Sequence, residues 1–99
     1  MTTATDPSIS VVIPARNEIG AIGPLVEGSG QVLAGRDFEV IIVDDGSTDG
    51  TPHTLAALSA RHPWLSSCRN EQSRGQSASI RRGVRMARGP VIVTLDGDG

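Results

Sequence analysis

The chain has 99 residues, enough for one small domain, and its nine basic and eleven acidic side chains give a formal net charge of −2. This balance argues against a general nucleic-acid-binding surface. Cys68 is the single cysteine, so no internal disulfide can form and a reduced, cytoplasmic setting fits better than a secreted one. Residues 1–8 lack the basic start and apolar stretch of a signal peptide and are expected to be flexible. No later apolar run approaches the length of about 20 residues that spans a bilayer.

Short β-branched runs alternate with longer segments of helical periodicity, as they do in parallel α/β sheets. In chain order we expect a strand at Ile9–Ile13, a helix over Ala21–Leu33, a strand at Val40–Val43 with Phe38 leading in, a helix from Thr51 that ends before Pro63, a weak strand at Ser66–Arg69, a helix over Gln76–Arg88 and a strand at Val91–Leu95. We expect the three apolar strands to be buried on both faces. Thr51 is a suitable N-cap for its helix. The fold class is therefore α/β, with a mainly parallel sheet and crossover helices, which is half of a nucleotide-binding architecture.

Two acids follow the last apolar run. Asp96 and Asp98 would lie at the carboxyl end of a strand, where open α/β sheets bind ligands. Two carboxylates separated by one glycine can turn toward the same hard divalent cation. A solvated turn is the alternative, because Asp and Gly are common turn residues.

A second acidic cluster follows the second strand. Asp44 or Asp45 would emerge beside the end of the first strand and could accept hydrogen bonds from the base or ribose of a nucleotide. Asp49 is better placed to cap the following helix. A calcium loop of the EF-hand type is excluded, because its twelfth position is Ala56 and the preceding element is a strand.

The first strand also delivers polar groups to this edge of the sheet. Pro14 fixes the backbone as it leaves the strand, and Arg16, Asn17 or Glu18 can face a ligand. The glycine pattern of dinucleotide-binding dehydrogenases is absent from this turn, and so is the phosphate loop with Gly-Lys-Ser/Thr. A nucleotide would therefore be bound in another way, for example through a metal ion that contacts its diphosphate.

Four segments, in this order and spacing, resemble the N-terminal half of the inverting family 2 glycosyltransferases, which have the glycosyltransferase A fold. They are V-V-I-P-A-R-N-E at 11–18, V-D-D-G-S-T-D-G-T at 43–51, G-Q-S-A-S-I-R-R-G at 75–83 and V-T-L-D-G-D-G at 93–99. The likeness is greatest to the dolichyl- or polyprenyl-phosphate mannosyltransferase branch. It implies that residues 9–99 form a Rossmann-like donor half-domain that stops after the D-x-D motif.

The resemblance implies transfer, with inversion, of a hexose from a GDP- or UDP-sugar to a polyprenyl phosphate or another lipid or glycan acceptor. The substrate-binding candidates are Pro14, Ala15, Arg16, Glu18, Asp44, Asp45, Gln76, Arg81 and Asp96. Asp96 and Asp98 would hold Mg or Mn against the diphosphate. Ser73 stands where many relatives carry Asn, which puts one contact in question.

The resemblance also limits what these residues can do alone. Any catalytic base and the acceptor site would lie beyond Gly99, so the isolated chain is expected to be inactive. The full-length protein would be cytoplasmic and peripheral to the inner face of the membrane, with no nucleic-acid partner. The alternative hypothesis is a non-catalytic nucleotide- or metal-binding stub from a truncated reading frame.

Overall fold

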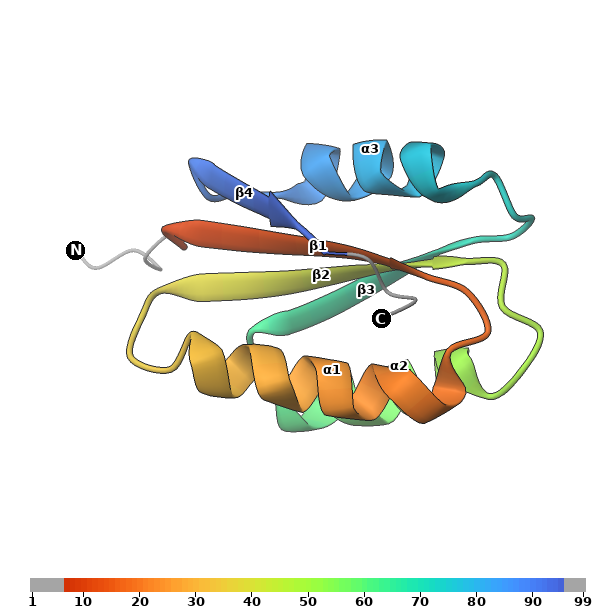
Figure 1. Cartoon of the computed structure of the whole chain (residues 1–99), viewed down its shortest axis with the longest axis horizontal. Coiled ribbons are helices and arrows are strands. Elements are labelled where there is room, and N and C mark those ends of the chain that lie inside the picture. Colours follow the sequence, from red (N-terminus) through yellow and green to blue (C-terminus); the bar gives the residue numbers. More distant parts are fainter. Residues whose placement is uncertain (1–6, 96–99) are drawn as a thin grey trace.

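The computed structural model describes residues 7–95 and consists of one four-stranded parallel sheet with helices on both faces. The strand order is β3-β2-β1-β4. The strands are β1 (Ile9–Ala15), β2 (Phe38–Asp45), β3 (Leu65–Asn70) and β4 (Val91–Thr94), and the helices are α1 (Ile19–Val32), α2 (Thr51–Arg61) and α3 (Gln76–Met86). Helices α1 and α2 cover one face and α3 covers the other (Figure 1). The α/β fold class with a parallel sheet is confirmed.

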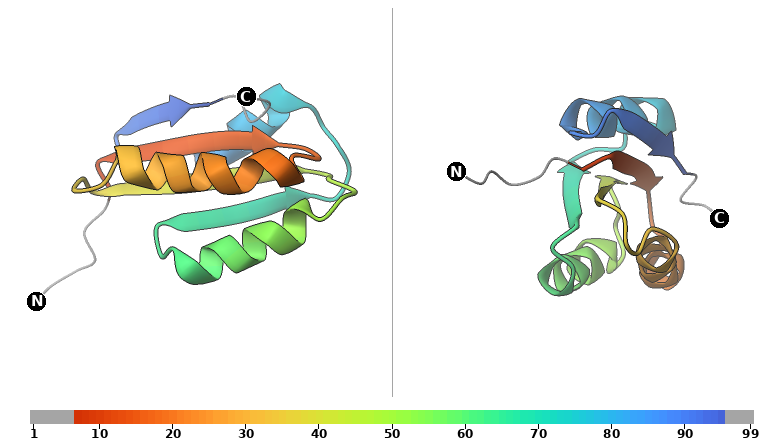
Figure 2. Two further views of the ribbon diagram at one scale, coloured as in Figure 1. Left: turned by 60° about the horizontal axis from the view of Figure 1, so that its bottom comes forward. Right: turned by 90° about the vertical axis from the view of Figure 1, so that its left-hand side faces the viewer.

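The main core lies between the sheet and the α1/α2 layer. Alternate residues of each strand point to this face, because side chains of a strand alternate between its two sides. Its buried members are Val11, Ile13, Ala15, Ile22, Val26, Val40, Ile42, Leu55, Leu58 and Leu65. The right-hand view of Figure 2 shows α1 and α2 side by side below the strands.

Helix α3 approaches the other face closely because it carries a glycine there. A Cβ atom on Gly83 would lie 2.3 Å from Val12 Cγ1 and 3.3 Å from Val43 Cγ2. Both valines belong to the side-chain set that points away from the α1/α2 core. Gly83 therefore sets the distance between α3 and the two central strands.

Strands β1 and β2 are longer than the sequence predicts, and this places several candidate residues inside the sheet. Pro14 pairs with Val43 in register. The carbonyl of Val12 accepts a hydrogen bond from Leu95, so the backbone groups of Val12 face β4. Backbone N–H and C=O groups along a strand point alternately to its two neighbours, so the backbone of Pro14 faces the β4 side, as that of Val12 does. Pro14 lies past Val12, the last residue of β1 that pairs with β4. A residue without an N–H group is tolerated at that position.

Strand β4 is correctly predicted as a parallel strand, but its predicted burial is wrong. It is the outermost strand, and the side chains of Val91, Ile92 and Val93 are 53%, 40% and 40% exposed. An apolar groove with a volume of about 450 Å³ runs between β4 and α1 and is lined by Val32, Leu33, Val93 and Leu95 among others. A run of apolar residues predicts burial only if another layer covers the strand, and within residues 7–95 no such layer lies against this flank.

The helix ends differ by a few residues from the prediction. Gly50 occupies the N-cap position of α2 and Thr51 is its first residue, so the predicted N-cap is wrong by one position. The prediction for Asp49 is confirmed, because its Oδ1 accepts a hydrogen bond of 2.9 Å from the backbone N–H of Thr51. Helix α2 ends before Pro63, as expected, whereas α3 ends at Met86 and its C-cap Ala87 is already extended.

A buried acidic residue ties the end of α3 to the amino ends of the central strands. Glu39 accepts hydrogen bonds from the Ser10 hydroxyl at 2.6 Å and from the Arg88 backbone N–H at 2.7 Å. Burial raises the pKa of Glu39, but these bonds and the Arg88 guanidinium outweigh it and hold the pKa below its usual value. This network lies at the opposite end of the sheet from the candidate site.

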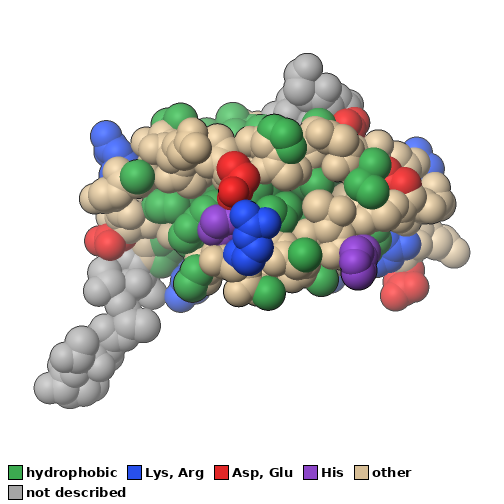
Figure 3. All heavy atoms as spheres, turned by 90° about the horizontal axis from the view of Figure 1, so that it is seen from below, with side chains coloured by type: hydrophobic (Ala, Val, Ile, Leu, Met, Phe, Trp, Pro, Cys, Tyr) green, Lys and Arg blue, Asp and Glu red, His purple; other side chains and the backbone are tan. Residues whose placement is uncertain are grey.

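The outer face of α1 and α2 carries scattered charges (Figure 3). Glu27 of α1 forms an ion pair of 3.2 Å with Arg61 of α2 and contacts His62. His62 also stacks on Trp64, with ring centroids 4.6 Å apart. Exposed pairs of this kind add little to stability, so the two helices are held together mainly by the core beneath them.

Candidate functional site

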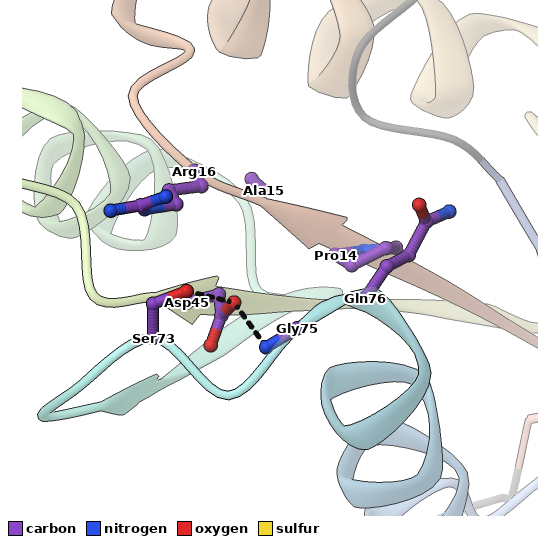
Figure 4. A pocket seen from close by; sticks show the side chains of 7 residues that line it. All are labelled: Pro14, Ala15, Arg16, Asp45, Ser73, Gly75 and Gln76. Atoms are coloured by element: carbon purple, nitrogen blue, oxygen red, sulfur yellow. Dashed lines mark hydrogen bonds between the residues drawn. The ribbon is translucent and has the colours of Figure 1, made fainter.

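A pocket with a volume of about 230 Å³ lies at the carboxyl ends of β1 and β2, beside the start of α3. This is the edge at which open α/β sheets bind ligands. Its lining residues, drawn in Figure 4, are Pro14, Ala15, Arg16, Asp45, Ser73, Gly75 and Gln76. Five of them are among the substrate-binding candidates predicted from the sequence.

Asp45 is the most heavily hydrogen-bonded side chain of the pocket. Its Oδ1 accepts from Asn70 Nδ2 at 2.9 Å and from the Arg74 backbone N–H at 2.7 Å. Its Oδ2 accepts from the Ser73 hydroxyl and from the Gly75 backbone N–H, both at 2.9 Å. A carboxylate offers about four lone-pair sites, and here each oxygen already has two donors.

These bonds also fix the charge of Asp45. Burial raises its pKa, yet the bonds from Arg74, Asn70, Ser73 and Gly75 more than compensate and lower the pKa to about 2. Donors that favour the charged form of a carboxyl group lower its pKa in this way. Asp45 is therefore a carboxylate at neutral pH.

The segment before α3 is shaped by these bonds and by two glycines. Gly75 has a φ of +95°, which an L side chain rarely adopts, and its N–H reaches Asp45. At Gly46, with a φ of +73°, a Cβ atom would lie 2.8 Å from the backbone nitrogen of Ser73. Ser73 itself, the departure from the family pattern, donates its hydroxyl to Asp45 and so takes part in the pocket wall.

Asp44 lies on the opposite face of β2 from Asp45, so the structure does not bring it to the pocket. Its Oδ2 forms an ion pair of 2.8 Å with Arg69 Nη1, and its Oδ1 accepts from the Ser47 backbone N–H at 3.0 Å. Asp44 is 2% exposed. Sequence reasoning left Asp44 and Asp45 as alternatives, and the alternation of the strand separates them.

Glu18 and Arg81 are likewise absent from the pocket lining. Glu18 is the N-cap residue of α1, where its carbonyl accepts hydrogen bonds from Ala21 and Ile22. Arg81 is exposed on α3. Its neighbour Arg82, which sequence analysis did not select, donates through Nη1 to Asn70 Oδ1 at 2.7 Å.

Asn70 and Ser79 form a supporting layer that the sequence did not reveal. Asn70 Nδ2 donates to both Asp45 Oδ1 and Ser79 Oγ, at 2.9 and 3.1 Å, and all three residues are buried. Arg82 orients the same amide group from its other side. Asn70 is the last residue of β3, one position beyond the weak strand predicted at Ser66–Arg69, and no motif marks it.

Asn17 connects the loops that follow β1 and β2. Its Oδ1 accepts from the backbone N–H of Thr48 at 2.7 Å and of Asp49 at 3.3 Å, and its own N–H donates to Ser47 Oγ at 2.8 Å. Asn17 has a φ of +54°, a conformation that Asn and Asp tolerate better than most side chains. Sequence analysis counted it among the residues that can face a ligand, whereas the structure turns its side chain into the loop.

Replacing Asn17 with glycine should lower the free energy of unfolding by about 1 to 2 kcal/mol, because the backbone conformation is kept but the accepting oxygen is lost. Asn17→Asp is the matched control, since it keeps an acceptor and tolerates the same φ. Urea unfolding of both variants measures the difference. Equal loss in the two variants would show that the oxygen contributes nothing.

The predicted metal ligands Asp96 and Asp98 lie outside the described residues. Within residues 7–95 there is no group of three or more His, Cys, Asp and Glu side chains that could hold a metal ion. Strand β4 ends with Thr94, which pairs with Val12 of β1. No helix in the same range is long and apolar enough to cross a membrane.

Comparison with known proteins gives relatives along nearly the whole chain. The dodecaprenyl-phosphate galacturonate synthase of Rhizobium johnstonii is 38% identical over 93 residues, which are 91% of this chain and 28% of that protein. The dolichol-phosphate mannosyltransferase of Pyrococcus furiosus is 33% identical over 90 residues, 91% of this chain and 25% of that protein.

Solved structures share the fold. The mannosyltransferase PcManGT from Pyrobaculum calidifontis, in complex with GDP-Man and Mn²⁺, superposes with a TM-score of 0.81 at 27% identity over 95% of this chain and 28% of that one. The glucosyl-3-phosphoglycerate synthase from Mycobacterium tuberculosis, in complex with Mn²⁺, UDP and glucosyl-3-phosphoglycerate, gives 0.73 at 27% identity over 92% and 33%. The structure thus has the architecture of a glycosyltransferase A fold.

This chain spans about a quarter to a third of the length of these proteins. The family model named Glycosyl transferase family 2 matches residues 10–99. That match includes all four segments on which the resemblance was based. The chain therefore belongs to glycosyl transferase family 2.

Proposed function

We propose that this chain is the donor-binding part of a glycosyltransferase and that its pocket binds a nucleoside-diphosphate hexose. The observation that carries the proposal is the pocket itself. It unites residues from three of the four family-like segments, namely Pro14 to Arg16, Asp45, and Gly75 with Gln76. The structural neighbours named above are complexes with GDP-Man or UDP, which supports a nucleotide ligand of this kind.

The residues of the pocket would bind and orient the nucleotide. The backbone at Pro14 and Ala15 forms one wall, and the Ser73–Gly75 segment, held by Asp45, forms the other. Because three hydrogen bonds to Asp45 fix this segment before a ligand arrives, little ordering is left for binding. Gln76 begins α3 and lines the pocket, so we expect it to contact the diphosphate or the sugar.

A divalent cation fits the donor set that follows β4. Asp96 and Asp98 would hold Mg or Mn, since hard cations prefer carboxylate oxygens. Such an ion, when bound, neutralises the charge that develops on the departing diphosphate. Both solved neighbours are complexes with Mn²⁺.

The acceptor is proposed from the names of the relatives, which include a dodecaprenyl-phosphate and a dolichol-phosphate enzyme. A polyprenyl phosphate would bring the full-length protein to the membrane surface. The chain spans only about a quarter to a third of the length of these enzymes, so we expect no transferase turnover from these 99 residues alone.

Calorimetric titration with GDP or UDP tests the proposal. The chain should bind one of them with an affinity that depends on Mn²⁺ or Mg²⁺, and Asp98→Ala should abolish that dependence. Asp37→Ala, which removes an exposed carboxylate at the other end of the sheet, is the matched control. Equal binding by wild type and Asp98→Ala in chelator would remove the metal role, and no binding of either nucleotide would remove the proposed function.

A further inference from the structure

We propose that the outer face of α3 is a docking surface for a membrane that carries anionic phospholipids. This basic face consists of Arg81, Val84 and Arg85, and it is flanked along the chain by Arg74 and Arg88. The choice of a membrane among anionic partners rests on the proposed function, because that function takes a polyprenyl phosphate as its acceptor.

The charges of the chain are unevenly distributed along the sequence. Five of the nine basic residues lie between residues 72 and 95, and none of the eleven acidic residues does. All five are arginines in or beside α3, so this layer is positive although the whole chain has a formal net charge of −2. A charged patch of one sign steers a molecule toward a partner of the opposite sign in one orientation.

Helical geometry places Arg81 and Arg85 on the side of α3 that faces away from the sheet. The buried residues of α3 are Ser79 and Gly83. Each arginine follows one of them by two positions, which is a rotation of about 200° around the helix axis. The two arginines are four positions apart and are therefore neighbours on the helix surface, and both are exposed. Among residues 7–95, no other element lies over this side of α3 (Figures 1 and 2).

The arginines of this face have no acidic partner in the described part of the chain. The side chains of Arg81, Arg85 and the preceding Arg74 form no ion pair and no hydrogen bond with residues 7–95. Arg82 and Arg88, in contrast, are held by side chains of the sheet. A guanidinium binds phosphate oxygens through paired N–H donors, so the unpartnered arginines can bind phosphate groups outside the molecule.

The size and composition of the face favour a membrane over a nucleic acid. Helix α3 has 11 residues and is about 16 Å long, which is too short to follow many phosphates along a duplex. It carries no aromatic side chain on which a base could stack. Val84, which is 38% exposed, lies between the two arginines along the chain. An apolar side chain beside basic ones suits the boundary between lipid headgroups and acyl chains.

Docking through this face would place the pocket beside the membrane. Gln76 lines the pocket and begins α3, and Arg81 follows it at about 8 Å along the helix axis. Figure 1 shows α3 lying along the strands, so one end of the docked helix would be at the pocket. The pocket would then open close to the layer in which the phosphate group of a polyprenyl acceptor lies.

Co-sedimentation of the 99-residue chain with lipid vesicles tests the inference. Vesicles of phosphatidylcholine are compared with vesicles in which about one third of the lipid is phosphatidylglycerol, at low ionic strength and without nucleotide. The chain should bind only the anionic vesicles, and about 0.5 M NaCl should release it because salt screens the charges. The net charge of −2 alone would predict no such binding.

Paired variants locate the docking surface. Arg81→Gln with Arg85→Gln should lower the vesicle partition coefficient about 20- to 30-fold, since each arginine near an anionic surface contributes about fivefold. Arg81→Lys with Arg85→Lys keeps both charges and should bind nearly as wild type does. The matched control is Arg36→Gln with Arg61→Gln, which makes the same change of charge on exposed arginines away from α3 and should bind as wild type does. Thermal melts should be unchanged, because Gln and Lys are good helix formers.

Three results would overturn the inference. They are equal binding of neutral and anionic vesicles, undiminished binding by the glutamine pair, and binding of a duplex oligonucleotide in place of vesicles, which would make the partner a nucleic acid. Calorimetric titration with GDP and UDP in the absence of vesicles tests the proposed function separately. Nucleotide binding without vesicle binding would overturn the inference alone, whereas vesicle binding without nucleotide binding would support the docking surface and remove the proposed function.

Discussion

Asp45→Asn is expected to lower the free energy of unfolding by about 2 to 3 kcal/mol and to abolish nucleotide binding. The amide keeps the shape of the carboxylate but presents an NH₂ group to two of the four donors that now surround it. Asn70 is buried and cannot turn to water for a replacement. Losing hydrogen bonds to a charged acceptor and leaving a buried donor unpaired are both costly.

The same substitution should change how stability depends on pH. The pKa of Asp45 is about 2 in the folded chain against an ordinary value of 3.8, so the folded state favours the charged form. Its contribution is complete above pH 3.8 and is lost as the pH falls through 3.8 toward 2. The shift corresponds to roughly 2 kcal/mol. Asp45→Asn should lack this part of the acid destabilisation.

Urea unfolding at pH 7 and at pH 2 to 4 measures both effects. Asp37→Asn is the matched control, because it makes the same chemical change on an exposed side chain. Glu39 also has a lowered pKa, but it contributes equally to wild type and variants and cancels in the comparison. A variant as stable as wild type at pH 7, with the same acid profile, would contradict the role assigned to these four bonds.

Gly83→Ala is expected to destabilise the chain by about 1 to 3 kcal/mol, although alanine is the better helix former. The added Cβ would lie 2.3 Å from Val12 Cγ1, and a β-branched side chain in a buried strand has no free rotamer to move into. Overpacking forces the helix away from the sheet. Because α3 supports Asn70 through Ser79 and Arg82, the pocket should be disturbed as well.

Gly28→Ala in α1 is the matched control for this effect. A Cβ atom there meets nothing within 4 Å, so the variant should gain the helix propensity of alanine, about 0.5 to 1 kcal/mol. Thermal or urea unfolding should therefore shift in opposite directions for the two variants. Equal shifts of the same sign would show that the contact between α3 and β1 is looser than the structure has it.

The strands and helices could be predicted from sequence because each apolar run has its own period and its own breakers. The parallel sheet follows from their alternation, and Asp49 could be identified as a cap from its place before Thr51. The sequence did not predict which helices would cover which strands. Val91 to Val93 look like a buried strand, yet burial depends on a neighbouring layer rather than on the run itself.

The candidate site could also be predicted only in part, because its lining depends on how the elements pack. Pro14, Arg16 and Asp45 could be located because strand ends converge on one edge of the sheet. Period-two alternation implies that Asp44 and Asp45 face opposite sides, but only the packing of α2 and α3 shows which side is the pocket. Asn70 has no local signal, since its role depends on partners that are distant in sequence.

The exposed flank of β4 predicts that folding is coupled to self-association. A strand edge bordered by an apolar groove can pair with a second copy, and only the folded chain presents that edge. Anything that binds the folded state alone raises its apparent stability by mass action. The melting temperature of these 99 residues would then rise with the protein concentration. A melting temperature for this segment would therefore have meaning only together with the concentration at which it was measured.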